Sequence, residues 1–342
     1  DGNSRAPVAP GGRAPSCALD STTMTSESGE TLAGLGEFAV IGRLTAQRTQ
    51  PPEVVVGPGD DAALLTAADG RVVVSTDMLV EGRHFRRDWS TPHDVGRKAI
   101  AQNAADIEAM GARPYAFVVG FGAPVDTAAA DAQALSDGMW SEATRFGAGI
   151  VGGDLVAAPQ WVVSVTVLGD LGGRPPVLLS GAQPGDTVAV VGDLGWSAAG
   201  YAMYHNGIHE FDELRRRHLV PYVHYGQGAA AAAAGATAMT DVSDGLVADL
   251  GHIADASGVV VELSMAALDA DVATLTPAAA MIGGDARGWV LGGGEDHVLV
   301  GTFSGALPAG WRAIGTVLPG EPRVTVDGAS WHGAGGWESF GQ

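Results

Sequence analysis

The sequence predicts an α+β protein of two domains. Its 342 residues are enough for two domains of ordinary size, and 46% of them are apolar, which is sufficient for sizeable cores. Helical and extended patterns alternate on both sides of GDLGGRPPVLLSGAQPGD, residues 169–186, whose glycines and prolines are typical of a linker. We therefore expect a first domain over residues 31–170 and a second domain over residues 171–342.

Residues 1–30 are expected to form a disordered extension, because they are rich in Gly, Pro, Ser and Thr. They lack the apolar core of a signal peptide, and Met24 is a candidate for the true translation start. Cys17 is the only cysteine of the sequence, so no intrachain disulfide can form, which is typical of a reducing compartment. We expect a cytoplasmic protein.

The first domain is expected to alternate short strands with helices. Its longest helix, over residues 94–114, has Asp94 as a candidate N-cap and ends at Pro114. The apolar stripe of this helix consists of Ile100, Ala104, Ile107 and Gly111. The other expected segments are helices near 35–44 and 128–146 and strands near 53–56, 62–65, 71–76, 116–121 and 161–168.

The second domain is expected to begin with the strand TVAVVG, residues 187–192. An alanine run at 229–234 is most simply helical. The other expected strands lie near 259–263, 296–303 and 323–327, and the helices near 196–206, 226–235 and 244–256. These segments indicate a second unit of mixed helices and strands.

The charge balance and several missing motifs argue against some classes of function. With 39 acidic against 19 basic residues the net charge is −20, which disfavours sequence-independent nucleic-acid binding and anionic membrane surfaces. Lys98 is the only lysine and lies outside any G-x-x-x-x-G-K pattern, so a Walker A loop is absent. The glycines of residues 190–200 do not have dinucleotide-loop spacing, and protein-kinase motifs and zinc-type Cys/His clusters are missing. No run of 18 apolar residues predicts a membrane span.

Acidic residues recur in apolar or glycine-rich surroundings, where carboxylates are rare unless a cation balances them. The chain has too few basic residues to pair them all, and several carboxylates together suit Mg²⁺. Any single one could instead be a turn, a helix cap or part of a solvated face, so the interpretation depends on the whole set. The set consists of Asp60, Asp61, Asp77, Asp106, Asp154, Asp241, Asp244, Glu295 and Asp296.

Strand geometry narrows the choice of ligands near the start of the first domain. Neighbouring side chains of an extended segment point to opposite faces, so of the two adjacent aspartates in GPGDDAA we favour Asp61. Ser75 and Asp77 share one face of their strand. Thr76 between them could offer its hydroxyl or its backbone carbonyl.

Two further candidates lie on or beside helices. Asp106 follows Asn103 by three residues and lies next to the apolar stripe of its helix. In DVSDGL, Ser243 can cap the helix that follows, and a helix N-terminus attracts phosphate through its free N–H groups. The neighbouring Asp241 and Asp244 fit a phosphate site only if Mg²⁺ lies between them and the phosphate. A plain N-cap is the alternative for Ser243.

Seven stretches of the sequence form an ordered set: GEFAVIGRL, GPGDDAAL, STDMLVEGRHF, KAIAQNAADIEAMGARP, GIVGGDL, DVSDGLVADLGHIA and GGGEDHVL. Together they resemble the thiamine-monophosphate kinase family, which belongs to the ATP-binding superfamily of aminoimidazole ribonucleotide synthetase. The resemblance covers about residues 35–341. A single motif such as GGD is weak, but the ordered set is highly specific. It implies a mixed-sheet N-terminal domain that binds ATP and Mg²⁺ and forms a homodimer, and an α+β C-terminal domain.

The resemblance implies transfer of the γ-phosphoryl group of ATP to thiamine monophosphate, with several Mg²⁺ ions. The implied metal ligands are Asp61, Ser75, Thr76, Asp77, Asp106, Asp154, Asp241 and Asp244, of which Asp77, Asp106, Asp154 and Asp241 are expected to be catalytic. Gly153, Asp154 and Ser243 are implied to contact ATP, and His84, Glu295 and Trp337 to contact thiamine monophosphate. Trp337 would stack on a thiamine ring, although it could also be an anchor of the C-terminal core. The acceptor phosphate is already anionic, so we expect direct in-line transfer without a strong base or a phosphoenzyme.

One departure from the family pattern concerns nucleotide binding. Leu179 stands where the family usually has an arginine that contacts ATP phosphates, so another cation such as Arg174 would have to substitute, or nucleotide binding is weakened. Gly293, where the family often has Ser, is expected to matter little. Two alternatives stay open: an enzyme of the same superfamily with a different acceptor, and, because of Leu179, a non-catalytic nucleotide or Mg²⁺ sensor. His84 and Trp337 favour thiamine phosphate as the acceptor.

Overall fold

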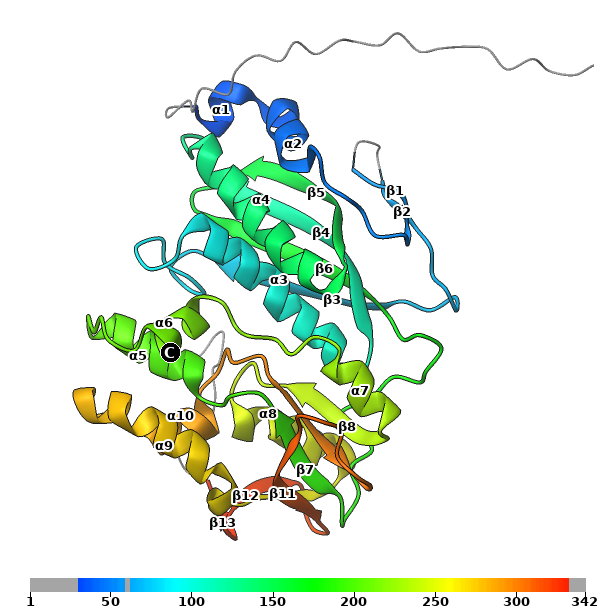
Figure 1. Cartoon of the computed structure of the whole chain (residues 1–342), viewed down its shortest axis with the longest axis vertical. Coiled ribbons are helices and arrows are strands. Elements are labelled where there is room, and N and C mark those ends of the chain that lie inside the picture. Colours follow the sequence, from blue (N-terminus) through cyan, green and yellow to red (C-terminus); the bar gives the residue numbers. More distant parts are fainter. Residues whose placement is uncertain (1–29, 59–61, 332–342) are drawn as a thin grey trace, which may run out of the picture.

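Two β-sheets organise the chain in the computed structural model, which describes residues 30–58 and 62–331 (Figure 1). A four-stranded sheet with the order β3-β6-β4-β5 belongs to the first half of the sequence. A seven-stranded sheet with the order β13-β12-β9-β11-β7-β10-β8 belongs to the second half. Helices accompany both sheets, so the predicted α+β fold with a mixed N-terminal sheet is confirmed.

The four-stranded sheet is covered by two long helices on one face (Figure 1). Strands β3 (Val73–Val80), β6 (Val162–Asp170) and β4 (Arg113–Ala123) pair antiparallel, and β4 pairs parallel with β5 (Gly149–Ala157). The covering helices are α3 (Pro92–Ala109) and α4 (Ala129–Ala143). The smaller elements of this half are α1 (Leu32–Leu35), α2 (Glu37–Thr45), β1 (Val54–Val56), β2 (Leu64–Leu65) and the 3-10 helix η1 (Thr144–Phe146).

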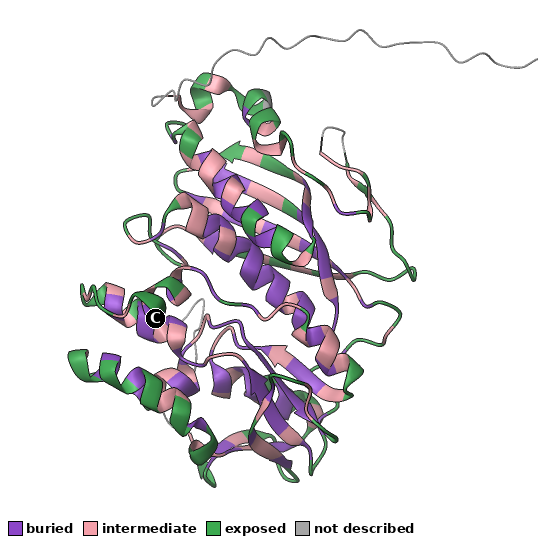
Figure 2. Cartoon of the chain, viewed as in Figure 1, coloured by how far each residue is buried: buried purple, intermediate pink, exposed green. Residues whose placement is uncertain are grey.

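Helices α3 and α4 cross at close range because each has a glycine at the contact. A Cβ atom at Gly96 would lie 2.0 Å from the carbonyl oxygen of Leu135, and one at Gly138 would lie 2.0 Å from that of His93. Three members of the predicted stripe of α3, Ile100, Ala104 and Ile107, have no exposed surface. α3 is purple along much of its length in Figure 2 because it is packed between the sheet, α4 and the second half of the chain.

The predicted ends of α3 are wrong by a few residues. The helix begins at Pro92, and Thr91 is its N-cap, while Asp94 completes a capping box from the third helical position. It ends at Ala109, because the chain turns at Gly111, whose φ is +74°, and enters β4. Pro114 therefore belongs to a strand and does not terminate the helix.

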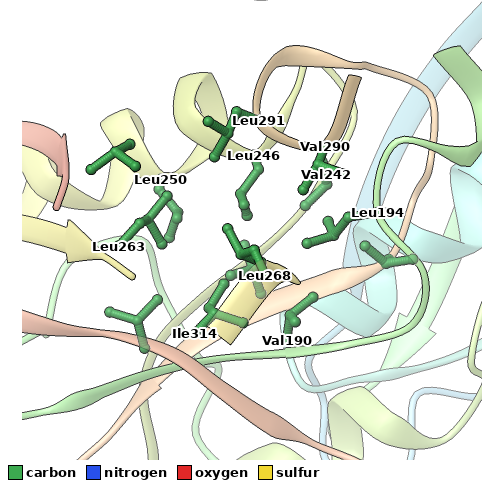
Figure 3. Close-up of a cluster of buried hydrophobic side chains, with 14 of the residues drawn as sticks. Val190, Leu194, Val242, Leu246, Leu250, Leu263, Leu268, Val290, Leu291 and Ile314 are labelled. Carbon is green, nitrogen blue, oxygen red and sulfur yellow. The ribbon is translucent and has the colours of Figure 1, made fainter. Parts of the chain in front are cut away.

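The seven-stranded sheet is antiparallel except for the β12–β9 pair. Its strands are β7 (Thr187–Val191), β8 (Ala236–Asp241), β9 (Val260–Leu263), β10 (Leu299–Phe303), β11 (Arg312–Leu318), β12 (Arg323–Val326) and β13 (Ala329–Ser330). The helices are α5 (Trp196–His205), α6 (Asp212–Leu219), α7 (Gln227–Ala233), α8 (Leu246–Ser257), α9 (Met265–Ile282) and α10 (Ala286–Gly292). Aliphatic side chains of these strands and helices meet in one core, in which Leu246, Leu250 and Leu263 are fully buried (Figure 3).

Helix α9 is long and apolar enough to satisfy a test for membrane spans, with a mean hydropathy of 1.3 over 18 residues, 22% of them buried. Length and composition alone are weak indications of a span. The helix contains Asp269 and Asp271, and the Asp271 carboxylate accepts a hydrogen bond of 2.7 Å from Arg312. Leu268 and Leu275 of α9 are fully buried in the core.

Helix α3 connects the two halves of the molecule. Besides its own sheet and α4, it contacts α6, α7, β8 and β10 of the second half. Near its C-terminal end, the buried carboxylate of Glu108 accepts hydrogen bonds of 2.8 Å from the backbone N–H groups of Gly226 and Gly228, at the start of α7. Side chains on α3 can therefore meet side chains from both halves.

Candidate active site

Strand β3 and helix α3 bring the first group of predicted site residues together. The hydroxyl of Ser75 donates to the Asp106 carboxylate at 2.6 Å. The backbone N–H of Asp77 donates to the side-chain oxygen of Asn103 at 3.0 Å, and Gln102 donates to the Asp77 carboxylate at 3.3 Å. Ser75 and Asp77 therefore share the face of β3 that packs on α3, as the strand period predicts.

Asp241 brings a carboxylate from the second half of the chain to this group. It ends β8, is 7% exposed, and lies 3.0 Å from the Nδ1 atom of His297. Burial, together with the negative charges of Asp241 and Asp77, raises the pKa of Asp106 to about 7. Burial lowers the pKa of His297, but the hydrogen bond and charge of Asp241 outweigh this effect, so the net shift is upward. Asp77, Asp106 and Asp241 thus form one electrostatic cluster.

The start of α8 differs from the prediction. Gly245 is the N-cap, with a φ of +129° and no space for a side chain, because a Cβ atom would lie 2.7 Å from the carbonyl oxygen of Gly292. Ser243 therefore does not cap this helix. The carboxylate of Asp249 instead accepts the backbone N–H groups of Asp244 and Gly245, each at 3.0 Å.

Asp244, Asp249 and His252 form a group that was not predicted as a whole. One ligand atom from each lies within 4.8 Å of the others, a spacing at which they could hold a metal ion. Burial raises the pKa of Asp249 to about 7, and Asp241 and Asp244 contribute to the shift. Asp249 and His252 are three residues apart on one helix, and this spacing is the signal that sequence reasoning overlooked.

His84 and Glu295 approach each other from the two halves of the chain. The Nδ1 atom of His84 accepts the backbone N–H of Val80 at 3.0 Å, and burial lowers its pKa, which favours the neutral ring. Lys98 of α3 donates to both oxygens of Glu295, at 3.1 and 3.2 Å, and to the backbone carbonyl of His84 at 3.0 Å. His218 also lies close, with its Nδ1 atom 3.7 Å from Glu295. Lys98 and His218 were not predicted as site residues.

Asp154 lies away from the carboxylate cluster, on the other face of the four-stranded sheet. Across the strands its position aligns with that of Met78 on β3. Because side chains alternate between faces, Asp154 shares a face with Thr76 and not with Asp77. Strands β6 and β4 separate β5 from β3, a span of roughly 14 Å. Within one chain, the structure therefore does not bring Asp154 and its neighbour Gly153 to the cluster.

Asp296 was expected near a bound cation, but its carboxylate is bound by backbone N–H groups. Its carboxylate accepts the backbone N–H groups of Gly195 and Ser197, the latter at 2.9 Å, at the N-terminus of α5. Burial raises its pKa to about 7, although these two hydrogen bonds act in the opposite direction. The partners of this carboxylate are therefore N–H groups of the protein, and the expected role beside a cation is not needed to explain its burial.

Thr76, Leu179 and Arg174 each make a hydrogen bond that involves a backbone carbonyl. Thr76 is exposed, and its hydroxyl donates to the carbonyl of Val165 at 2.9 Å. Leu179 is 41% exposed, and its carbonyl accepts the Ser257 hydroxyl at 3.1 Å. Arg174 points toward the carbonyl of Gly111 at 3.5 Å, and its Nε atom has no hydrogen-bond partner among the described residues. Asp60, Asp61 and Trp337 lie outside the described residues.

Comparison with known proteins identifies the family of the chain. Residues 59–171 match the family of AIR synthase related proteins, N-terminal domain, and residues 183–288 match the corresponding C-terminal domain. The thiamine-monophosphate kinase of Mycobacterium tuberculosis is 69% identical over 312 residues, which cover 91% of this chain and 94% of that protein. The chain belongs to the thiamine-monophosphate kinase family.

Solved structures of thiamine-monophosphate kinases have the same fold. The crystal structure of the enzyme from Stenotrophomonas maltophilia K279a has a TM-score of 0.75 and 31% identity, covering 87% of this chain and 98% of that one. A structure described as AaThiL complexed with AMPPCP and TMP has a TM-score of 0.70 and 28% identity, covering 94% and 100%. The resemblance found in the sequence motifs is therefore confirmed over most of the chain.

Proposed function

We propose that this protein transfers the γ-phosphoryl group of ATP to thiamine monophosphate and releases thiamine diphosphate and ADP. The observation that carries the proposal is the 69% identity to a thiamine-monophosphate kinase over 94% of that protein. A relative with the same fold is described in complex with AMPPCP and TMP. The convergent carboxylates of β3, α3 and β8 provide the chemistry that such a reaction requires.

Several Mg²⁺ ions would be held by Asp77, Asp106, Asp241 and Asp244, with Ser75, Thr76 and Asp61 as further ligands. The donor set fits hard divalent cations, because oxygen ligands dominate it. The pKa of Asp106 is raised to about 7 by burial and by the charges of Asp241 and Asp77, a repulsion that a cation would remove. When bound, Mg²⁺ neutralises phosphate charge during transfer.

The chain itself mainly positions the reactants. The attacking oxygen belongs to the phosphate of the acceptor and is already anionic, so no side chain has to remove a proton from it. We assign the acceptor to His84, Glu295 and Trp337, and the nucleotide to Gly153, Asp154 and Ser243. The neutral ring of His84 and the carboxylate of Glu295 would bind the acceptor by hydrogen bonds. Direct in-line transfer follows, without a phosphoenzyme.

The active unit would be a homodimer formed through the outer face of the four-stranded sheet. The exposed fractions of Val74, Met78, Val118 and Val156 on this face are 64%, 51%, 38% and 53%, and a monomer would leave this apolar surface in water. Asp154 lies on the same face. A second copy packed on it can bring Asp154 of the partner subunit to Thr76 of the edge strand β3, next to the position of Asp77.

Mixing two inactive variants tests this arrangement. If Asp154 serves the neighbouring site, dimers that combine an Asp77→Asn chain with an Asp154→Asn chain contain one intact site. About one quarter of the wild-type rate should then return after the chains are exchanged, because half of the dimers are mixed. If Asp154 serves its own chain, no activity returns. A monomeric protein in sedimentation would contradict the dimer itself.

We also propose a domain boundary between residues 170 and 171 and a cytoplasmic location. The boundary is supported by the chain passing from the first sheet to the second between β6 and β7. The location is supported by the nature of the substrates, ATP and a thiamine phosphate. Protease digestion of the 171–186 segment would test the boundary, since cleavage there should release two fragments that remain folded.

The function itself is tested by incubating the purified protein with ATP, Mg²⁺ and thiamine monophosphate and following thiamine diphosphate by chromatography. Product should form, EDTA should abolish it, and Asp77→Asn should slow its formation on the order of a hundredfold or more. If product forms only when another acceptor is supplied, the protein is a different enzyme of the superfamily. ATP binding without turnover of any acceptor would favour a sensor.

A further inference from the structure

Lys98 makes contacts that have no role in the proposed reaction. It is the only lysine of the sequence, and it is 2% exposed. An ammonium group is rarely buried without compensating partners, because removal from water is costly. Its surroundings are therefore informative about its role.

The three N–H donors of Lys98 have three acceptors. One is the backbone carbonyl of His84 at 3.0 Å, in the loop that follows β3. The other two are the carboxylate oxygens of Glu295 at 3.2 and 3.1 Å, in the segment between α10 and β10. One ammonium group thus joins α3 to two segments that are 211 positions apart in the sequence.

Glu295 needs such a partner to hold its position. Its backbone φ is +63°, a left-handed conformation that is strained for residues with a side chain. Its side chain is 33% exposed and is therefore partly accessible, while both carboxylate oxygens accept from Lys98. His218 lies 3.7 Å away, but its ring is held by the hydroxyl of Ser197 at 3.2 Å and is no substitute for Lys98.

We propose that Lys98 is the positioning residue of the acceptor site. It fixes the distance between His84 and Glu295, the two acceptor contacts from different halves of the chain, and aims the Glu295 carboxylate at the acceptor. Because Lys98 has no free donor and almost no exposed surface, it acts through Glu295 and His84 and not by touching the substrate. The inference rests on the proposed function, which assigns the acceptor to His84 and Glu295.

The kinetic test is Lys98→Met, which removes the charge while retaining much of the side-chain volume. We expect the KM for thiamine monophosphate to rise roughly tenfold to a hundredfold, because a charge-assisted contact is lost. The KM for ATP should stay within about twofold, since the carboxylate cluster is unchanged. Lys98→Arg should recover part of the loss, because it retains the charge but changes the geometry.

A double-mutant cycle separates positioning from general stabilisation. If Lys98 acts mainly through Glu295, adding Lys98→Met to Glu295→Gln should change the KM for thiamine monophosphate by less than about threefold. Equal effects in both backgrounds, or an equal rise in the KM for ATP, would overturn the proposal. If one of the single variants does not fold, the ¹⁵N-lysine signal of the wild type with and without thiamine monophosphate still tests the proposal.

The matched control is Arg97→Met on the same helix. Arg97 pairs with the buried Glu142 at 2.9 Å, within the first half of the chain, and Glu142 retains Arg145 and Tyr225 as partners. This variant also removes an ion pair of α3, but it should leave both KM values unchanged. A rise in the KM for thiamine monophosphate equal to that of Lys98→Met would show a non-specific effect of α3 and contradict the proposal.

The single lysine also gives a test that does not depend on turnover. Protein labelled with ¹⁵N-lysine has one ε-ammonium signal, and Glu295→Gln should shift it because two hydrogen-bond acceptors change. Thiamine monophosphate should shift the same signal in the wild type. If neither change moves the signal, the proposal is wrong. If the acceptor moves it but no product forms, the proposed function fails and the role of Lys98 in binding stands.

Discussion

The described part of the molecule has two groups of buried carboxylates with different partners. Asp296 and Glu108 form one group, and Asp241 belongs to the other. Asp296 and Glu108 each accept two backbone N–H groups at the N-terminus of a helix. Asp241 faces Asp106 and Asp77, and its hydrogen-bonding partner is the His297 ring. Backbone N–H groups at helix N-termini offset part of the burial cost of the first two charges, whereas the active-site carboxylates are left facing one another.

This difference explains how one molecule uses buried carboxylates in two ways. A carboxylate compensated by fixed N–H groups stabilises the fold and has little affinity left for a cation. Carboxylates that face one another repel, and they bind a divalent cation more favourably because it removes the repulsion. Substitutions in the two groups should therefore affect different properties.

The largest effect is expected at the active-site cluster. Asp77→Asn should lower kcat on the order of a hundredfold to a thousandfold, because it removes charge that holds cations at the transferring phosphate. The melting temperature should stay the same or rise, since the variant relieves repulsion with Asp106. Steady-state kinetics and calorimetry measure the two properties. A large loss of stability with normal kcat would show that Asp77 mainly stabilises the fold, as Asp296 and Glu108 do.

The opposite outcome is expected for Asp296→Asn. The amide retains one acceptor but turns an NH₂ group toward a backbone donor, so the free energy of unfolding should fall by about 1 to 3 kcal/mol. At a temperature where the variant is folded, kcat should stay within about threefold of the wild type. Urea denaturation followed by an activity assay checks both values. A folded variant with kcat reduced a hundredfold would assign Asp296 to the active site.

Proton competition provides the next test. With a pKa of about 7, the metal-free Asp106 carboxyl is protonated below pH 7, and a cation has to displace that proton. The Mg²⁺ concentration for half-maximal activity should therefore rise up to about tenfold per pH unit below 7 and be independent of pH well above 7. Asp296 also has a pKa near 7, but Asp296→Asn should retain the whole dependence. A requirement for Mg²⁺ that is constant from pH 5.5 to 8 would contradict the assignment.

The smallest effect is expected at Leu179. Its side chain is 41% exposed, so Leu179→Arg can be accommodated without repacking. If this position lies near the ATP phosphates, the added charge should lower the KM for ATP about threefold to tenfold and leave the KM for thiamine monophosphate unchanged. Leu179→Gln is the neutral control. No change in the KM for ATP would mean that another cation already serves the nucleotide.

Local patterns predicted part of the site. The two-residue period of β3 placed Ser75 and Asp77 on one face, and the helical period placed Asp106 beside the buried stripe of α3. The partners of Asp296 were not predictable in this way, because the acceptor and the N–H donors of Gly195 and Ser197 are about one hundred positions apart. Whether a carboxylate meets N–H groups or another carboxylate is decided by such tertiary contacts.

The wrong N-cap of α8 and the unexpected face of Asp154 have the same origin. Ser243 has a suitable side chain for an N-cap, but the close approach of Gly292 selects Gly245 for that position. Asp154 was grouped with the other acidic motifs because of its glycine-rich surroundings, while strand register places it on the opposite face. Strands β5, β8 and β11 and helices α6, α9 and α10 were also missed, several in alanine- and glycine-rich stretches with weak periodicity.

We infer that the facing carboxylates, and not those that accept N–H groups at helix N-termini, hold divalent cations. The most direct measurement is Mn²⁺ binding by electron paramagnetic resonance, with Mn²⁺ replacing Mg²⁺, on the wild type, Asp106→Asn and Asp296→Asn at pH 8. We expect Asp106→Asn to weaken Mn²⁺ binding at least about tenfold, and Asp296→Asn to bind Mn²⁺ like the wild type. Equal binding by the wild type and Asp106→Asn would contradict it.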